Sequence, residues 1–189
     1  MKKILILEGS PRLNGNSCLL SDEFARGAEE AGCSVEKIAV ARKRVAGCLG
    51  CNACYRNDGV CVQKDDMVEI REKMLGADVI VLASPIYFYS MTAQLKAVID
   101  RFQRYFEARF ARGIRPAIAT HRDAVLLLTM GRYDPFAVEV CEKTLRQSFS
   151  VMNTTLKKTV VLPDTDRADC ENSAIFAKAQ EIAIEIARE

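Results

Sequence analysis

The 189-residue sequence lacks three features that would each point to a particular class of protein: a strong net charge, a long apolar run and a set of histidines. Its net charge is +2, which gives no overall electrostatic attraction to nucleic acid or to an anionic membrane surface. No segment approaches the roughly 18 consecutive apolar residues that span a bilayer. No internal repeat, low-complexity tract or linker interrupts the chain, so we expect a single domain over residues 1–189.

The sequence also lacks a secretory signal and a histidine-based site. The apolar run near the start ends at Glu8, too early for the h-region of about 7–15 residues that a signal peptide needs. We therefore expect a cytoplasmic protein, in which thiols stay reduced. The one histidine, His121, lies in an expected loop, and we interpret it as a solvated side chain rather than a catalytic one.

Short apolar strands and helices alternate along the whole chain. We expect strands at 2–8, 34–40, 78–83, 123–129 and 155–162, and helices at 16–31, 67–75, 92–110, 135–151 and 169–188. This alternation predicts an α/β fold with a parallel sheet and helices on both faces. Five strands fit the flavodoxin-like doubly wound order 2-1-3-4-5, in which a ligand lies at the carboxyl ends of strands one and three.

Local signals predict where several elements begin and end. Asn16 is expected to cap the helix after strand one, and Gly32 to close that helix. Asp65 or Asp66 is expected to cap the helix at 67–75, and Ser84-Pro85 to stop strand three. The last helix is amphipathic, and its expected apolar face consists of Ile175, Ala179, Ile182 and Ile186.

The loop after strand one, residues 9–17, is rich in small polar residues and runs into a helix N-terminus. Backbone N–H groups and the helix dipole favour an anion there. The spacing of Gly9 and Gly15 excludes the G-x-G-x-x-G dinucleotide fingerprint, and no lysine completes a Walker A loop. A terminal monophosphate therefore fits better than a pyrophosphate; the alternative is a simple polar capped turn. The candidate phosphate ligands are Ser10, Arg12, Asn14, Asn16 and Ser17.

The loop after strand three, residues 84–92, carries three adjacent aromatic residues at the expected ligand mouth. Apolar and aromatic walls suit a flat ring system, and Pro85 stiffens the turn. The alternative is that these aromatic side chains belong to the core or to a subunit contact. Thr129 and Gly131, which follow strand four, are placed to flank the same ring.

Four of the eight cysteines lie in one cysteine-rich loop, residues 46–63, with the spacing C-x2-C-x2-C-x6-C. Thiolates suit iron–sulfur clusters, and C-x2-C-x2-C is a spacing that wraps a cubane. Structural zinc also takes four cysteines, usually as two separated C-x2-C pairs, and metal-free redox-active thiols are a third interpretation. The candidate metal ligands are Cys48, Cys51, Cys54 and Cys61. The scattered cysteines are expected to be small buried side chains: Cys18, Cys33, Cys141 and Cys170.

An aromatic stripe and a set of arginines are interpreted as structural features rather than as parts of a cofactor site. The aromatic stripe at helical spacing is expected to be core or a dimer interface: Phe102, Tyr105, Phe106 and Phe110. Six arginines crowd one region and are interpreted as a solvated face, with contact to the 2′-phosphate of NADPH or to another acidic partner as the alternative: Arg101, Arg104, Arg109, Arg112, Arg115 and Arg122.

Several motifs occur together in one order: Gly-Ser-Pro-Arg-x-Asn-Gly-Asn-Ser at 9–17, Cys-x2-Cys-x2-Cys at 48–54, Lys-Asp-Asp-Met at 64–67, Ser-Pro-Ile-Tyr-Phe at 84–88 and Thr-Ala-Gln-Leu-Lys-Ala-Val-Ile-Asp-Arg at 92–101. Over about residues 3–131 the chain resembles the iron–sulfur flavoprotein branch of the NADPH-dependent FMN reductase-like flavodoxin-fold proteins. The resemblance implies FMN, with its phosphate at the five candidate ligands of the first loop, and a homodimer or homotetramer. It implies a 4Fe–4S cluster on the four loop cysteines and an isoalloxazine ring against Pro85, Ile86, Tyr87 and Phe88.

These features favour an FMN-containing redox protein that passes electrons between FMN, a 4Fe–4S cluster and a small electron-carrier protein. Without the cluster, an NAD(P)H-dependent FMN or quinone reductase is the better interpretation. A non-enzymatic flavin-binding redox sensor and a zinc-stabilised binding module are further alternatives, and the phosphate loop and the aromatic loop argue against the zinc module. No catalytic side chain is expected, because flavin chemistry needs little acid–base help from the protein. We expect neither a nucleic-acid partner nor a membrane partner.

Overall fold

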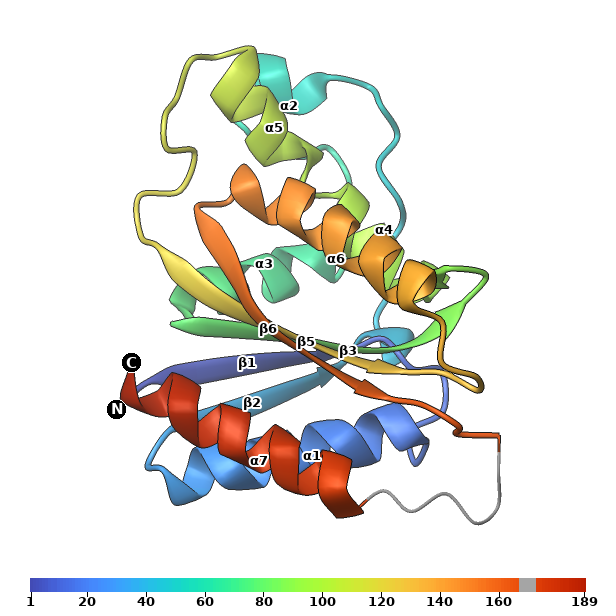
Figure 1. Cartoon of the computed structure of the whole chain (residues 1–189). Helices are drawn as coiled ribbons and strands as arrows, with labels where there is room; N and C mark the ends of the chain where they lie inside the picture. Colours follow the sequence, from blue (N-terminus) through green and yellow to red (C-terminus); the bar gives the residue numbers. More distant parts are fainter. Residues whose placement is uncertain (167–172) are drawn as a thin grey trace.

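The computed structural model describes residues 1–166 and 173–189, and it has a central sheet between two layers of helices (Figure 1). Its strands are β1 (Lys3–Glu8), β2 (Ser34–Ala39), β3 (Val79–Tyr87), β4 (Ser90–Met91), β5 (Arg122–Thr129) and β6 (Thr154–Leu162). Its helices are α1 (Asn16–Glu30), α2 (Ala53–Arg56), α3 (Met67–Gly76), α4 (Ala93–Asp100), α5 (Gln103–Phe110), α6 (Pro135–Ser150) and α7 (Ser173–Arg188), with a 3-10 turn, η1, at Val40–Arg42.

The sheet has the predicted topology. Its strands run in the order β2-β1-β3-β5-β6, each pairing is parallel, and β4 adds only an antiparallel pairing to the end of β3. With the short β4 set aside, this is the order 2-1-3-4-5, so the flavodoxin-like fold is confirmed. The carboxyl ends of β1, β3 and β5 therefore meet at one edge, where a doubly wound sheet binds its ligand.

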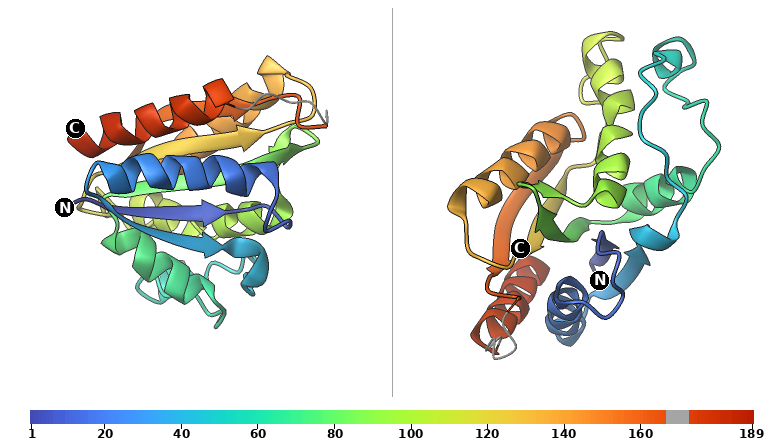
Figure 2. Two further views of the ribbon diagram at one scale, coloured as in Figure 1. Left: turned by 90° about the horizontal axis from the view of Figure 1, so that it is seen from below. Right: turned by 90° about the vertical axis from the view of Figure 1, so that its right-hand side faces the viewer.

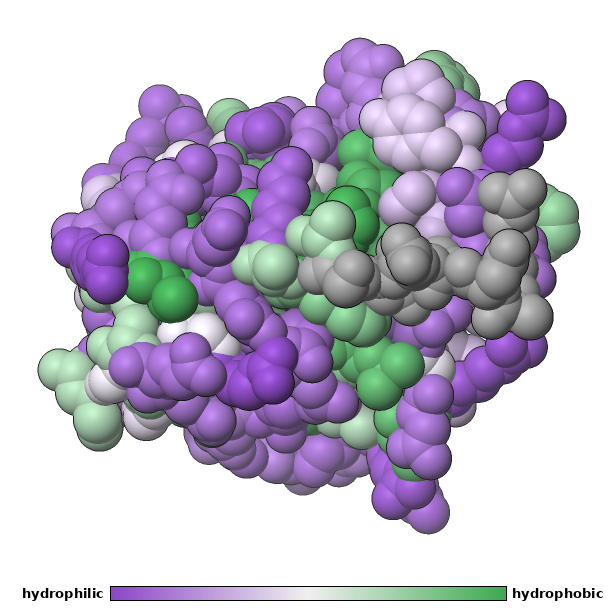
Figure 3. Space-filling model, turned by 60° about the horizontal axis from the view of Figure 1, so that its bottom comes forward, coloured by the Kyte–Doolittle hydropathy of each residue, from purple (hydrophilic) through white to green (hydrophobic). Residues whose placement is uncertain are grey.

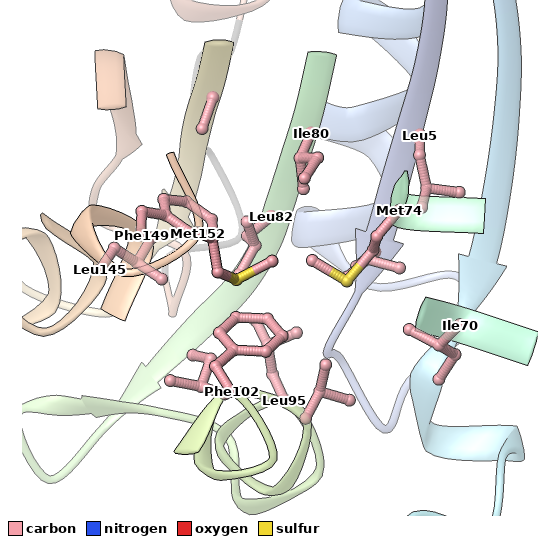
Figure 4. Close-up of a cluster of buried hydrophobic side chains, with 14 of the residues drawn as sticks. Leu5, Ile70, Met74, Ile80, Leu82, Leu95, Phe102, Leu145, Phe149 and Met152 are labelled. Carbon is pink, nitrogen blue, oxygen red and sulfur yellow. The ribbon is translucent and has the colours of Figure 1, made fainter. Parts of the chain in front are cut away.

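Each face of the sheet packs on its own layer of helices (Figures 1 and 2). Helices α1 and α7 cover one face, and α3, α4 and α6 cover the other. In the second layer, Phe102 and Phe149 stack with ring centroids 6.2 Å apart near Leu82 of β3 (Figure 4). Burying each such side chain contributes about 1.5–3 kcal/mol, so these layers hold the sheet edge in place.

The α1–α7 layer depends on a close approach of two helices. A Cβ atom at Gly27 of α1 would lie 2.7 Å from the backbone of Gln180 in α7, so glycine is needed there. The predicted apolar face of α7 is confirmed: Ala179, Ile182 and Ile186 are buried and Ile175 packs against them. The outer face of this layer is mostly hydrophilic, with apolar side chains in small separate patches (Figure 3). The predicted helix start at 169 and Cys170 lie outside the described residues.

Strand three is longer than predicted, because Ser84 and Pro85 do not stop it. β1 pairs with β3 only as far as Ala83, and Ser84 and Pro85 pair with β5 alone. Proline is tolerated where a strand has a free edge, since its missing N–H then breaks no ladder. The chain then turns back at residues 88–89 into β4, a hairpin that the sequence analysis missed.

Other element boundaries also differ from the prediction. Gly15, not Asn16, is the N-cap of α1, and no side chain caps that helix. The predicted helix at 92–110 is two helices, α4 and α5, with a break at Arg101. Asp66 takes the N-cap position of α3, but the Met67 N–H donates to Asp65 Oδ1 instead, at 3.3 Å. Strand β2 ends at Ala39, and the cysteine-rich loop contains the single turn α2. Among the described helices, none is both long and apolar enough to cross a bilayer.

Candidate functional site

A cavity of about 490 Å³ lies at the carboxyl ends of β1, β3 and β5. Three of its walls come from the loops that the sequence singled out, and ten of the eleven predicted cofactor contacts line it. The exception is Phe88. The complete lining is Ser10, Arg12, Asn14, Gly15, Asn16, Ser17, Pro85, Ile86, Tyr87, Thr129, Met130, Gly131, Thr165 and Asp166.

The polar wall of the cavity is a tight turn at the N-terminus of α1. The Ser10 hydroxyl accepts from the Arg12 N–H at 3.1 Å and donates to the Arg12 carbonyl at 2.9 Å. Because Gly15 provides no side-chain cap, no protein side chain caps the Asn16 and Ser17 amides at the start of α1, while the Cys18 N–H donates to the Gly15 carbonyl at 2.9 Å. The Ser17 hydroxyl is buried against the Thr129 hydroxyl at 2.7 Å, which ties this wall to β5. The arrangement has the donors and the helix dipole that a phosphate requires.

The apolar wall is formed by Pro85, Ile86 and the half-exposed Tyr87 at the end of β3. Thr92, the N-cap of α4, fixes it: its N–H donates to the Ser84 hydroxyl at 3.2 Å, and its hydroxyl donates to the Gly9 carbonyl at 2.7 Å. Both Thr92 and Ser84 are fully buried. The two loops that flank the cavity are therefore joined by buried hydrogen bonds, which gives the site a fixed width.

Phe88, the remaining predicted ring contact, does not line the cavity. Its side chain is 100% exposed at the tip of the β3–β4 hairpin, where Phe88 and Tyr89 have φ angles of 49° and 63°. A two-residue hairpin turn of this type needs positive φ at both central residues. The turn thus directs Phe88 outward, while Tyr89 packs edge-on against Phe136 with ring centroids 5.6 Å apart.

Thr165 and Asp166, which follow β6, line the cavity and were missed. The Asn16 side-chain amide donates to the Thr165 carbonyl at 3.4 Å, which draws this segment to the polar wall. A Cβ atom at Gly131 would lie 1.9 Å from the Asp166 carboxylate, so the Asp166 side chain occupies the space beside Gly131. The signal was available, since the carboxyl end of the last strand also faces the ligand edge.

The residues present fit FMN. One end of the cavity offers hydroxyls, amides, a guanidinium and a helix N-terminus, which suit a monophosphate; the other offers apolar and aromatic surface, which suits a ring. A small flat molecule with one anionic end matches both walls.

The cysteine-rich loop lies outside this cavity, where its turn α2 contacts α5. Cys48 and Cys51 are exposed, and Cys54 and Cys61 are half-buried. Burial raises the pKa of the Cys54 thiol, and the charges of Glu107, Cys48 and Cys61 add to this effect. Three of the thiols therefore share one neighbourhood, and their chemistry suits a cluster. Within the described residues, however, no group of three cysteine, histidine or carboxylate side chains has the arrangement of a metal site.

The six arginines do not form the solvated face that was expected. Arg122 is buried and donates to the backbone carbonyls of Leu75, Ala77 and Thr120, so it has a structural role. Arg101 is also buried and reaches the cysteine-rich loop. The others separate: Arg109 and Arg115 lie over the ring of Phe110, Arg104 lies over that of Tyr105, and Arg112 is near Asp58.

The remaining candidates agree with their predicted roles in part. Cys18 and Cys141 are buried, and burial raises the pKa of Cys141 to about 11. Cys33 is half-buried and packs against the α1–α7 core. His121 is exposed, 2.9 Å from the Thr155 hydroxyl. In the aromatic stripe, Phe102 and Tyr105 are core, and Phe106 and Phe110 remain exposed.

Known proteins similar to this chain include iron–sulfur flavoproteins. One from Archaeoglobus fulgidus is 41% identical over 105 residues, which cover 56% of this chain and 47% of that protein. Another, from Methanocaldococcus jannaschii, is 43% identical over 99 residues, which cover 52% of this chain and 51% of that protein. The chain thus spans about half the length of these curated relatives.

The fold has close structural counterparts, and a sequence family covers most of the chain. The solved NAD(P)H:quinone oxidoreductase of Methanothermobacter marburgensis superposes with a TM-score of 0.71 at 20% identity, covering 99% of this chain and 94% of that one. At that identity the likeness concerns the fold alone. The family described as NADPH-dependent FMN reductase matches residues 2–166. This chain belongs to the NADPH-dependent FMN reductase family.

Proposed function

We propose that this protein is an FMN-dependent oxidoreductase. The observation that carries the proposal is that one cavity joins a monophosphate-type wall, Ser10 to Ser17, to an apolar wall, Pro85 to Tyr87. Family membership over residues 2–166 and relatives named iron–sulfur flavoprotein support it.

The residues of the cavity have separate parts in this proposal. Ser10, Arg12 and the first-turn amides of α1 hold the phosphate, with Asn14, Asn16 and Ser17 beside them. Pro85, Ile86 and Tyr87 orient the ring, and Thr129 and Gly131 flank it. The Asp166 carboxylate accepts hydrogen bonds only, so it suits the hydroxyls between phosphate and ring and repels the phosphate itself. When bound, FMN supplies the exchange between two-electron and one-electron steps.

We further propose that the cysteine-rich loop binds a 4Fe–4S cluster through Cys48, Cys51, Cys54 and Cys61. The spacing of the cysteines and the names of the relatives support this. Such a cluster would supply single-electron exchange with a small electron-carrier protein. The proposal includes a cytoplasmic location, since reduced thiols are stable in that compartment, and a homodimer or homotetramer, as the resemblance to this family implies.

A cluster-free NAD(P)H-dependent FMN or quinone reductase is the second candidate. It is favoured by the absence of a ready metal-ligand group among the described residues. It differs from the first candidate in needing a nicotinamide donor above the flavin ring.

An anaerobic preparation separates the two candidates. Iron, sulfide and FMN are counted per chain together with an ultraviolet–visible spectrum. Flavin bands over a broad brown absorbance with about four irons per FMN support the two-centre protein. FMN without iron after reconstitution supports the cluster-free reductase, and NAD(P)H oxidation with a quinone then measures its turnover. A protein that binds no FMN contradicts both.

The assignment of the phosphate wall is tested by comparing FMN with riboflavin, which lacks the phosphate. In Arg12→Gln we expect FMN affinity to fall about tenfold, because a charge-assisted hydrogen bond contributes about 1.5–3 kcal/mol, with riboflavin affinity unchanged. Arg26→Gln, an exposed arginine on α1 paired with Glu23, is the matched control. An equal loss of affinity for FMN and riboflavin in Arg12→Gln would mean that Arg12 does not bind the phosphate.

A further inference from the structure

The two ends of the cysteine-rich loop are fastened to each other by hydrogen bonds. The Arg44 N–H donates to the Asp66 carboxylate at 2.7 Å, and the Asp66 N–H donates back to the Arg44 carbonyl at 3.0 Å. The Ala46 N–H donates to the Asp65 carboxylate at 3.1 Å, and the Gln63 amide donates to the Gly47 carbonyl at 3.1 Å. We call these residues the loop neck: Arg44, Ala46, Gly47, Gln63, Asp65 and Asp66.

Arg101 inserts its guanidinium into this neck from the break between α4 and α5. Its side chain is 4% exposed. One nitrogen, Nη1, donates to Asp65 Oδ2 at 2.6 Å and to the Ala46 carbonyl at 3.0 Å. The other, Nη2, donates to the sulfur of Cys61 at 3.3 Å. One side chain therefore holds both ends of the loop and one of its four cysteines.

The position of the neck in the sequence explains why this matters for the cysteines. Cys48 follows Ala46 by two residues, and Cys61 precedes Gln63 by two residues. Closing the neck thus brings the first and the last cysteine of the motif to the same place. We propose that Arg101 is the positioning residue of the cysteine-rich loop: it holds the neck closed and fixes the sulfur of Cys61 as one member of a thiolate ligand set. The second part of this inference, that Cys61 is a cluster ligand, rests on the proposed cluster.

The charges around Cys61 agree with a positioning role. A small cavity of about 150 Å³ lies beside the neck, and its lining includes Cys61, Arg71, Arg101 and Arg104. Asp65 is the carboxylate that pairs with Arg101 there. Arginine forks donate strongly to anionic acceptors, and a thiolate-bound cluster is anionic. Donors to a ligand sulfur stabilise the more negative, reduced state, so losing Arg101 should move the cluster potential to more negative values.

Two measurements on the full-length protein test the inference. In Arg101→Gln we expect hydrogen exchange at residues 44–50 and 60–68 to become about tenfold faster, since the neck loses a charge-assisted bond. After anaerobic reconstitution, a redox titration followed by electron paramagnetic resonance should show the more negative potential. Arg101→Lys, which keeps the charge but not the fork, should recover the potential in part and the exchange protection little. Arg26→Gln should match the wild type in both.

A second variant separates positioning from simple loss of folding. Arg101→Gln combined with Asp65→Asn leaves no buried unpaired charge, so it should fold and bind FMN as the wild type does. We expect its neck to exchange as fast as in the single variant. The inference is wrong if a folded variant that lacks Arg101 keeps both the wild-type protection of the neck from hydrogen exchange and the wild-type cluster potential. If the wild-type protein takes up no iron, the proposed cluster and the role of Cys61 as its ligand are both wrong. The hydrogen-exchange rates would still decide whether Arg101 closes the neck.

Discussion

The cavity at the sheet edge and the cysteine-rich loop differ in how much of their geometry the protein fixes without a ligand. The walls of the cavity are joined by buried hydrogen bonds, such as those of Thr92 and the Ser17–Thr129 pair. The hydrogen bonds that fasten the loop lie at its neck, its turn α2 contacts α5, and two of its four thiols are exposed. A small-molecule site on a rigid sheet can be preformed, whereas thiolates that repel one another gain their final arrangement from the metal.

The largest expected effect comes from removing the loop thiols together, because this should abolish one site and spare the other. In Cys48→Ser/Cys51→Ser/Cys54→Ser we expect iron after anaerobic reconstitution to fall from about four per chain to none. FMN affinity, measured by fluorescence quenching, should stay within about twofold, since these residues lie outside the cavity. Cys33→Ser is the control and should keep its iron. If the triple variant retains iron, the cysteine-rich loop is not the metal site.

A smaller effect is expected from disturbing the walls of the cavity, the more rigid of the two regions. A Cβ atom at Gly9 would lie 2.8 Å from Leu95 Cβ and 2.9 Å from the Thr92 hydroxyl, both buried. Gly9→Ala should lower the free energy of unfolding by about 1–3 kcal/mol, as overpacked cores do, and weaken FMN binding.

Gly76→Ala is the matched control for this substitution, because its Cβ atom would meet nothing within 4 Å. Urea unfolding of both variants, with and without FMN, gives the comparison. Equal free energies of unfolding for the two alanine variants would mean that Leu95 and Thr92 can move aside to accommodate the added Cβ atom.

The buried hydroxyl pair that joins the polar wall to β5 should have an effect of about 1–3 kcal/mol on the free energy of unfolding. Thr129→Val leaves the buried Ser17 hydroxyl without its partner at 2.7 Å, which costs about 1–3 kcal/mol. Adding Ser17→Ala removes the unsatisfied group, so the double variant should be more stable than the single one. Urea unfolding measures both, and a double variant less stable than Thr129→Val would show that the hydroxyl has another partner.

Sequence pattern was sufficient for the fold and for the three loops that line the cavity, because each depends on local features. Alternating apolar strands and helices predict a parallel sheet, five strands fit the flavodoxin-like order, and small polar residues mark the turn at Gly9–Ser17. The β3–β4 hairpin was not predictable, since Phe88 and Tyr89 carry none of the glycine or asparagine signal of a two-residue turn. Neither was the break at Arg101, whose side chain pairs with Asp65, 36 residues away. Features that depend on distant contacts are not visible in local pattern.

The smallest effect is a difference in thiol chemistry that leaves function unchanged. Burial raises the pKa of Cys141 from 9.0 to about 11, so its thiolate fraction near pH 8 should be about a hundredfold lower than that of an unperturbed thiol. In the iron-free protein, iodoacetamide at that pH, followed by peptide mass spectrometry, should label the exposed Cys48 and Cys51 quickly and Cys141 hardly at all. In urea the three rates should converge. Fast labelling of Cys141 in the folded protein would mean that the α6 layer opens readily, and the contrast between a rigid body and an open loop would then be weaker than the packing indicates.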